Sequence, residues 1–340
     1  MPETTPPQST TRLTVAMVVR NDAEALTQTL SNIASLADEI VVVDTGSTDN
    51  SREIVAQYHG KLIDFPWCDD FSAARNSALE QITGEWILWL DAGETLSDSD
   101  KTEMRKVISA GQLDSSTAYV LVIQPPPAPG VIAAEQIARV RLVPNKPSIR
   151  FQGRVRESLY ETLENVGLDI DGLPFRIERG DRENDVALKR RRAQRNLRLA
   201  DLEITALGRT PTLINCLAEA AQTLGDAPRA VELYTETLEA EDQPSNERLE
   251  AYYGLLTSLD AIANARSTQL SLCIKALEEF PLDAQLLCAM GGYLQADNQL
   301  DLAIRSYQTA YEFGHVNPLV WHLDAITAIA AVCHLSLIHI

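Results

Sequence analysis

The chain has 340 residues, of which 45% are hydrophobic and 23% charged, and its formal net charge is −19. That length allows two domains, and the composition is that of a soluble globular protein. The negative charge argues against nucleic acid as a main partner, because phosphate binding needs an excess of Lys and Arg, and against charge-driven binding to anionic membranes. The five scattered cysteines form no CxxC pair, which indicates idle thiols in a reducing cytosol rather than a disulfide framework.

Both ends of the sequence look unlike folded protein. Residues 1–11 are rich in Pro, Ser and Thr and lack an apolar core, so we expect a disordered tail rather than a signal peptide. No apolar run approaches the roughly 20 residues needed to cross a bilayer, so we predict no transmembrane segment and a cytoplasmic location. Residues 335–340 read LSLIHI, which a common sequencing adapter would encode in this frame. We therefore expect them to be an artefact and the natural chain to continue beyond about Cys333.

Residues 12–185 alternate buried strands with amphipathic helices. The β-branched and apolar runs predict strands at 13–19, 39–44, 61–65 and 85–90. Asn21-x-x-Glu24 and Asn50-x-x-Glu53 resemble capping boxes that begin two of the helices, and a third helix starts near Asp70. Strand–helix steps of this length predict right-handed crossovers and a doubly wound, mostly parallel sheet.

The predicted secondary structure changes twice after this region. From residue 118 the pattern predicts strands at 118–123, 138–143, 149–155 and 174–178, which would extend the sheet in an antiparallel or mixed manner. Residues 186–334 are helical throughout, and two similar blocks place Ala230 with Tyr234 and Ala303 with Tyr307. This resembles tetratricopeptide (TPR) helix pairs and predicts an all-α helical-repeat domain, which we expect to be truncated.

Polar side chains follow three of the predicted parallel strands. Asn21 comes after the first strand, Asp44 ends the second, and Asp91 follows the fourth. Ligands of open parallel sheets bind at the carboxyl ends of the strands, near a switch in strand order. Neither a GxGxxG nor a GxxxxGK[ST] pattern is present, which disfavours a dinucleotide fold or a P-loop. The carboxylate of Asp44 is instead suited to accept hydrogen bonds from a nucleobase N–H or from ribose hydroxyls.

Arg75 and Asn76 lie on the helix after the third strand. The apolar positions of that helix place Arg75 at the border of its buried face, from which it can reach the sheet edge. A guanidinium there would bind a pyrophosphate or hold a strand-end carboxylate. The sequence leaves both roles open.

Five blocks in this order resemble the family 2 glycosyltransferases of the GT-A fold, in particular a bacterial subgroup with C-terminal TPR-like helices. The blocks are LTVAMVVRND, EIVVVDTGSTD, DFPWCDDFSAARN, GEWILWLDAGE and RLVPNKPSIRFQGRVRES. The resemblance implies inverting transfer from a nucleotide-sugar donor, usually with Mg²⁺ or Mn²⁺. By the same resemblance, Asp44 would hold the base or ribose, and Arg75 and Asn76 would line the donor site. Asp91 would contact ribose and metal, and Glu157 would be the base that takes the proton of the acceptor hydroxyl.

The chain departs from the family pattern at three places. The family's Asp-Ala-Asp-Glu reads Asp91-Ala92-Gly93-Glu94, and two expected histidines are replaced, one of them by Arg156. A divalent cation bridging two phosphates needs only one or two protein carboxylates, so Asp91 with Glu94 could suffice. Alternatively, Arg156 or Arg179 could supply positive charge to the leaving diphosphate. We therefore count Asn21 and Arg156 with the donor-binding residues and leave the choice between metal and arginine open.

Two functions compete at this point. The first is an inverting glycosyltransferase that uses a nucleotide-sugar donor and acts on a protein, peptide or glycan acceptor presented by the helical repeats. The second is a catalytically degenerate transferase module that serves as a TPR-type interaction scaffold. The retained polar blocks favour the first function, and the lost Asp and His residues favour the second.

Overall fold

The computed structural model describes residues 12–126, 137–240, 244–262 and 266–314. The predicted tail at 1–11 and the predicted artefact at 335–340 lie outside these residues. Contacts divide the chain into two compact units. The first, called the sheet unit here, contains residues 12–122 and 139–179, and the second, the helical unit, contains the described residues of 123–138 and those from Gly180 onward.

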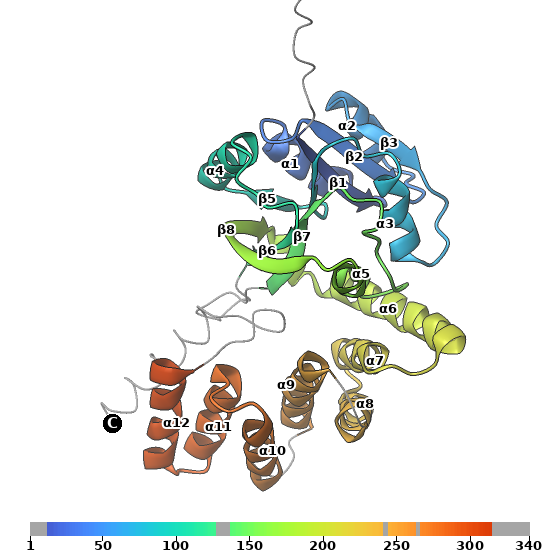
Figure 1. The fold of residues 1–340 in the computed structure, drawn as a ribbon. Coiled ribbons are helices and arrows are strands. Elements are labelled where there is room, and N and C mark those ends of the chain that lie inside the picture. Colours follow the sequence, from blue (N-terminus) through green and yellow to red (C-terminus); the bar gives the residue numbers. More distant parts are fainter. Residues whose placement is uncertain (1–11, 127–136, 241–243, 263–265, 315–340) are drawn as a thin grey trace, which may run out of the picture. The chain divides into compact units, whose positions relative to one another are not determined.

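Eight strands of the described residues form one mixed sheet, in the order β3-β2-β1-β4-β7-β6-β8-β5 (Figure 1). The strands are β1 (Leu13–Val19), β2 (Glu39–Asp44), β3 (Lys61–Asp64), β4 (Trp86–Trp89), β5 (Glu94–Leu96), β6 (Thr117–Gln124), β7 (Ile137–Pro144) and β8 (Asp169–Arg179). Strands β3, β2, β1 and β4 are parallel, whereas β7 is antiparallel to β4 and β5 is antiparallel to β8. The predicted α/β class and the mixed extension of its parallel sheet are therefore confirmed.

Five helices accompany these strands in the described part of the sheet unit. They are α1 (Ala23–Ile33), α2 (Ser51–Gln57), α3 (Phe71–Leu79), α4 (Asp98–Ser109) and α5 (Tyr160–Asn165). Helix α3 begins where the sequence predicted, because the Asp70 carboxylate accepts a hydrogen bond from the Ala73 N–H at 2.8 Å. Its apolar face, with Ala74 and Ala78, packs into a core that includes Trp89 of β4. This packing fixes the side of the sheet from which Arg75 projects.

The capping box predicted at Asn21 is wrong. Helix α1 begins at Ala23, and Asn21 adopts a φ of +52°, a left-handed conformation that cannot open a helix in the usual way. Asn tolerates this conformation better than most residues, which explains its place in the turn.

The strand predicted at 149–155 is also wrong. The segment forms a loop whose only ladder contact among the described residues is an isolated bridge between Gln152 and Ser158. Glu157 therefore follows a loop rather than a strand. The sequence also gave no sign of the short strand β5, which carries Glu94.

The helical unit consists of a 3₁₀ turn, η1 (Asp181–Asn184), followed by helices that pack in sequence (Figure 1). The helices are α6 (Val186–Leu207), α7 (Pro211–Leu224), α8 (Ala227–Glu239), α9 (Ser245–Ala261), α10 (Arg266–Glu279), α11 (Ala284–Ala296) and α12 (Leu300–Phe313). No helix of the described residues is both long and apolar enough to cross a membrane.

Each of the two tyrosines in the predicted repeat packs against a glycine of an adjacent helix, Tyr234 against the following helix and Tyr307 against the preceding one. A Cβ atom on Gly254 of α9 would lie 2.1 Å from the Tyr234 ring, and one on Gly291 of α11 would lie 2.8 Å from the Tyr307 ring. Each tyrosine therefore fills a place that only a glycine on the neighbouring helix leaves open. The predicted all-α character of this region is confirmed by its helices, and the TPR-like repeat stays a prediction.

Candidate functional site

Asp44 and Asp91 end strands that flank the central strand β1. Val19 of β1 pairs with Asp44 of β2, and Ala16 of β1 pairs with Trp89 of β4, two residues before Asp91. The two aspartates therefore lie at nearly the same height along the strands, about 10 Å apart across two strand spacings. This is the switch point of the sheet, where the chain continues from β1 to β2 on one side and later adds β4 on the other.

Main-chain N–H groups bind the Asp44 carboxylate. Its Oδ1 accepts hydrogen bonds from the N–H groups of Gly46 at 3.0 Å and Ser47 at 2.9 Å. Gly46 has a φ of +99°, which lets the turn point both N–H groups at one oxygen. Oδ2 is buried and has no hydrogen-bond partner among the described residues. Burial raises the pKa of Asp44, but the hydrogen bonds from Ser47 and Gly46 and the charge of Arg52 lower it below its ordinary value.

Asn21 ties the turn after β1 to the turn after β2. Its N–H donates to Ser47 Oγ at 2.9 Å, and its side-chain Oδ1 accepts from the Thr48 N–H at 2.7 Å. These bonds give Asn21 a structural task beside Asp44. Its contact with a nucleotide stays a prediction.

Arg52 is a residue of this edge that the sequence reasoning missed. Its Nη2 lies 3.3 Å from Asp44 Oδ1 and 2.5 Å from Asp64 Oδ1, at the end of β3. Its guanidinium thus joins the carboxyl ends of β2 and β3. The spacing offered a signal, because a residue in the first turn of a helix after a strand lies near that strand's carboxyl end.

Three arginines surround the Asp91 carboxylate, and we call Arg75, Arg141 and Arg179 the arginine cluster. The Nη2 atom of Arg75 lies 3.2 Å from Asp91 Oδ1, and those of Arg141 and Arg179 lie 3.1 and 3.6 Å from Oδ2. The three side chains come from α3, β7 and β8, so the sheet brings together groups far apart in sequence.

Glu94 shares two of these partners, Arg141 and Arg179. It is 1% exposed, and its Oε1 accepts hydrogen bonds from Arg141 Nη2 and Arg179 Nε, both at 2.9 Å. Its Oε2 accepts from the Asp91 N–H at 2.8 Å. Both carboxylate oxygens of Glu94 therefore accept hydrogen bonds that hold the turn containing Asp91.

The two carboxylates of this pair titrate in opposite directions. Burial would raise the pKa of Asp91, but the guanidinium groups of Arg141, Arg75 and Arg179 hold it well below its ordinary value. Burial raises the pKa of Glu94, and the adjacent Asp91 carboxylate adds to that increase. Of the two carboxylates, Asp91 is the one whose ionised form the surrounding guanidinium groups favour.

Arg75 connects Asp91 with Glu157. Its Nε donates to Glu157 Oε1 at 2.8 Å while its Nη2 donates to Asp91 at 3.2 Å. The guanidinium lies over the rings of Trp89 and Phe151, at 5.1 and 5.3 Å from their centroids. Aromatic faces attract a buried cation, so Arg75 is held in one orientation. The sequence left two roles open for Arg75, and the structure shows one of them, the contact with the strand-end carboxylate of Asp91.

Asn76 and its neighbours fasten α3 to the loop that precedes Glu157. The Asn76 amide donates to the Phe151 carbonyl at 2.9 Å and accepts from the Phe151 N–H at 2.8 Å. Ser72 Oγ donates to the Gly153 carbonyl at 2.5 Å. Arg156, in the same loop, adopts a φ of +53°. Donor contacts by Asn76 and Arg156 stay predictions.

The predicted metal ligands do not fit a divalent cation. Asp91 and Glu94 face three guanidinium groups, and position 93 is a glycine without a ligand atom. In the described part of the chain, no group of three His, Cys, Asp or Glu side chains is placed to hold a metal ion. A divalent cation prefers oxygen ligands and an excess of negative charge, which the arginines remove here.

Arg141 is the residue of this site that the sequence reasoning overlooked altogether. It was within a predicted strand, ARVRLV, and its 8% exposed side chain contacts both Asp91 and Glu94. A signal existed, because a charged side chain on a buried strand needs a partner of opposite charge. The antiparallel pairing that places it beside β4 could not be read from the sequence.

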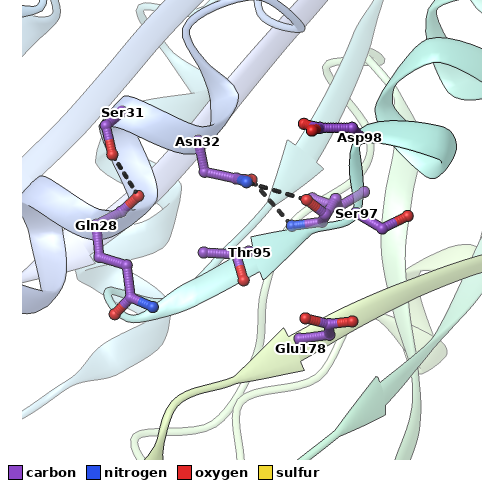
Figure 2. A pocket seen from close by; sticks show the side chains of 8 residues that line it. Gln28, Ser31, Asn32, Thr95, Ser97, Asp98 and Glu178 are labelled. Atoms are coloured by element: carbon purple, nitrogen blue, oxygen red, sulfur yellow. Dashed lines mark hydrogen bonds between the residues drawn. The ribbon is translucent and has the colours of Figure 1, made fainter.

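A hollow of about 460 Å³ lies near β5 but does not belong to this site (Figure 2). Thr95 and Glu178 line it, whereas the adjacent pair Glu94 and Arg179 belongs to the carboxylate–arginine contacts. Successive side chains of a strand point to opposite faces. The side chains of Thr95 and Glu178 therefore lie on the face opposite to the carboxylate–arginine contacts.

Comparison with known proteins finds a family and several relatives to which part of this chain is similar. Residues 14–131 match the model of the family described as glycosyl transferase family 2. A TPR repeat-containing protein of Synechococcus elongatus is 37% identical over 153 residues, 45% of this chain and 36% of that protein. The SPbeta prophage-derived glycosyltransferase SunS of Bacillus subtilis is 32% identical over 106 residues, 29% and 24% of the two chains.

A solved structure, S. aureus TarS 1–349, aligns with a TM-score of 0.39 and 16% identity, covering 84% of this chain and 92% of that one. The aligned parts span only about a third or a quarter of the length of the two curated relatives named above. The match to the family model, by contrast, covers β1 to β4 and both aspartates at their ends. Residues 14–131 of this chain are therefore similar to glycosyl transferase family 2.

Proposed function

We propose that this chain transfers a sugar from a nucleoside diphosphate donor to an acceptor hydroxyl, with inversion at the anomeric carbon. The observation that carries the proposal is Arg75, which donates to Asp91 and Glu157 at once. This contact brings a carboxylate at the switch point next to the candidate base. The match of residues 14–131 to glycosyl transferase family 2 supports the sugar-transfer chemistry.

The roles of the site residues follow from their positions. Asp44, whose buried Oδ2 has no partner among the described residues, offers an acceptor for the nucleobase or ribose. Asp91, 41% exposed and about 10 Å away, faces the ribose and diphosphate end of the donor. Asn21, between them in the sheet, keeps the first of these turns in shape.

Glu157 acts as the base in this proposal. The acceptor oxygen attacks the anomeric carbon, the bond from that carbon to the phosphate oxygen breaks, and its electron pair leaves with the diphosphate. The acceptor proton passes to Glu157, whose Oε1 is held by Arg75 Nε. Arg75 thus fixes the orientation of the carboxylate.

The helical unit presents the acceptor in this proposal. Its recurring tyrosine–glycine contacts are typical of stacked helix pairs, which form extended binding surfaces. A relative carries TPR repeats in its name, which supports a protein, peptide or glycan acceptor bound through these helices. A cytoplasmic location remains part of the proposal.

Donor hydrolysis and transfer test the function. The full chain is incubated with UDP-, GDP- and dTDP-sugars, and release of the nucleoside diphosphate is measured. Glu157→Gln should lower turnover by about 10²- to 10⁴-fold and leave nucleotide affinity unchanged. Glu164→Gln, at an exposed position of α5, is the matched control. A wild-type chain that neither turns over nor binds any of the nucleotides would support the alternative of an interaction scaffold.

A further inference from the structure

The arginine cluster lies where the family resemblance places a divalent cation. All three guanidinium groups lie within 3.6 Å of the Asp91 carboxylate, and two of them also contact Glu94. Arginine is permanently charged and presents a planar fork of N–H donors that matches phosphate oxygens. The protein itself therefore supplies the kind of charge that a metal would bring.

Resting on the proposed function, we propose that the diphosphate of the nucleotide donor binds directly to the arginine cluster and that donor binding needs no divalent cation. The leaving diphosphate takes up the electron pair of the broken bond, and the guanidinium groups stabilise the negative charge that develops on it.

Arg141 and Arg179 both contact the same two carboxylates, which supports a role in diphosphate binding beside a structural one. Arg141 Nη2 alone contacts both carboxylates, Asp91 at 3.1 Å and Glu94 at 2.9 Å. Arg179 repeats both contacts, although the buried pair is already bridged. Because Arg141 alone bridges the two carboxylates, Arg179 can exchange its contact with Asp91 for a phosphate oxygen while the pair stays bridged.

Two members of the cluster, Arg179 and Arg141, have different roles in this proposal. Arg179 is 22% exposed, and its Nε is fixed on Glu94, so its charge is oriented at the rim of the site. Arg141 is 8% exposed and holds Asp91 and Glu94 from below. We assign the direct diphosphate contact to Arg179 and the positioning of the carboxylates to Arg141.

The turn at Gly93 supports the absence of a second metal carboxylate. Gly93 has a φ of +94°, and its N–H donates to Thr29 Oγ1 at 2.9 Å. An aspartate at this position would be strained, because L side chains rarely adopt that conformation. The local backbone is therefore built for the sequence Asp-Ala-Gly-Glu.

Calorimetry on the full-length chain tests this inference. UDP, GDP and dTDP are titrated with millimolar Mn²⁺ and again with excess EDTA, and the nucleoside of the best ligand is titrated in parallel. We expect diphosphate affinity to change less than about threefold between the two conditions. Arg179→Gln should weaken diphosphate binding by about 10- to 100-fold and leave nucleoside binding unchanged, because only the phosphate contact is lost. Arg176→Gln, exposed on the same strand, is the control and should change neither.

The outcomes distinguish this inference from the proposed function. A loss of more than about tenfold in EDTA overturns the arginine assignment and leaves the proposed function standing. Binding of no nucleotide in either condition overturns the proposed function itself. The EDTA comparison uses the wild-type chain, so it remains decisive if Arg179→Gln fails to fold. Arg179→Lys keeps the charge but loses the planar fork of donors. Its affinity for diphosphate should lie between that of the wild-type chain and that of Arg179→Gln.

Discussion

Two carboxylates at the same sheet edge are stabilised in different ways. Asp44 is bound mainly by main-chain N–H groups of its own turn, and one oxygen keeps no partner among the described residues. Asp91 is bound by side chains from three distant elements, and both of its oxygens face guanidinium groups. The first arrangement depends only on neighbouring residues of the chain. The second depends on the whole sheet.

The largest expected effect comes from breaking the distant arrangement. Arg141→Met should lower the free energy of unfolding of the sheet unit by about 3 kcal/mol, because Asp91 and Glu94 lose a buried counter-charge. Urea unfolding followed by tryptophan fluorescence measures it. Arg139→Met, exposed on the same strand, should cost less than about 0.5 kcal/mol. Equal losses in both variants would show that Arg141 is not a buried counter-charge.

The local arrangement should respond in binding more than in stability. Asp44→Asn keeps an oxygen for the Gly46 and Ser47 N–H groups but replaces the other oxygen with an NH₂ group. We expect nucleoside affinity to fall by about tenfold or more, measured by calorimetry, since a donor would replace the unpartnered acceptor. Asp49→Asn, which changes a neighbouring carboxylate of the same turn, is the control. Unchanged affinity in Asp44→Asn would remove Asp44 from the nucleoside site.

A smaller effect concerns pH. The pKa of Asp44 is lowered in the folded chain, so its carboxylate stabilises the fold above its ordinary value of 3.8, and that contribution is lost as the pH falls through the lowered pKa. Asp44→Asn should therefore cost about 1 kcal/mol of unfolding free energy at neutral pH and progressively less in acid. Urea titrations between neutral pH and about pH 3 measure the difference. A cost that grew in acid would contradict the assignment.

The smallest effect is expected at Arg52. Its side chain is 38% exposed where it contacts Asp44 and Asp64, and ion pairs at the surface are screened by water and salt. Arg52→Gln should change nucleoside affinity by less than about threefold in the same calorimetric assay. A much larger loss of affinity would indicate that Arg52 contacts the ligand directly. The nucleoside site would then depend on Arg52 as well as on the Asp44 turn.

The same contrast explains how much could be predicted from the sequence. Strands β1 and β2 were predicted at their observed bounds, because continuous β-branched runs report local burial. The Asp44 turn was equally readable, since its partners lie within a few residues. Arg141 and the position of Arg179 beside Glu94 depend on pairings between β4 and β7 and between β5 and β8. Such pairings join segments 50 or more residues apart, and no local pattern encodes them.

Two local predictions failed for reasons of backbone conformation. Asn21 read as a helix cap, but its left-handed φ and its bonds to Ser47 and Thr48 place it in a turn. Residues 149–155 read as a strand, yet they are held to α3 through Asn76 and Ser72 instead of to a neighbouring strand. In both cases polar side chains far along the chain satisfied the backbone in place of regular structure.

The fastening of α3 to the loop before Glu157 makes the two segments one cooperative unit. The Asn76 side chain donates one hydrogen bond to the main chain of Phe151 and accepts another from it. The Phe71 N–H donates to the Arg154 carbonyl at 3.1 Å. Neither segment can open to solvent without releasing the other. Amide protons of Phe71 and Phe151 should therefore exchange with deuterium at matching rates and slow down together when a nucleotide binds.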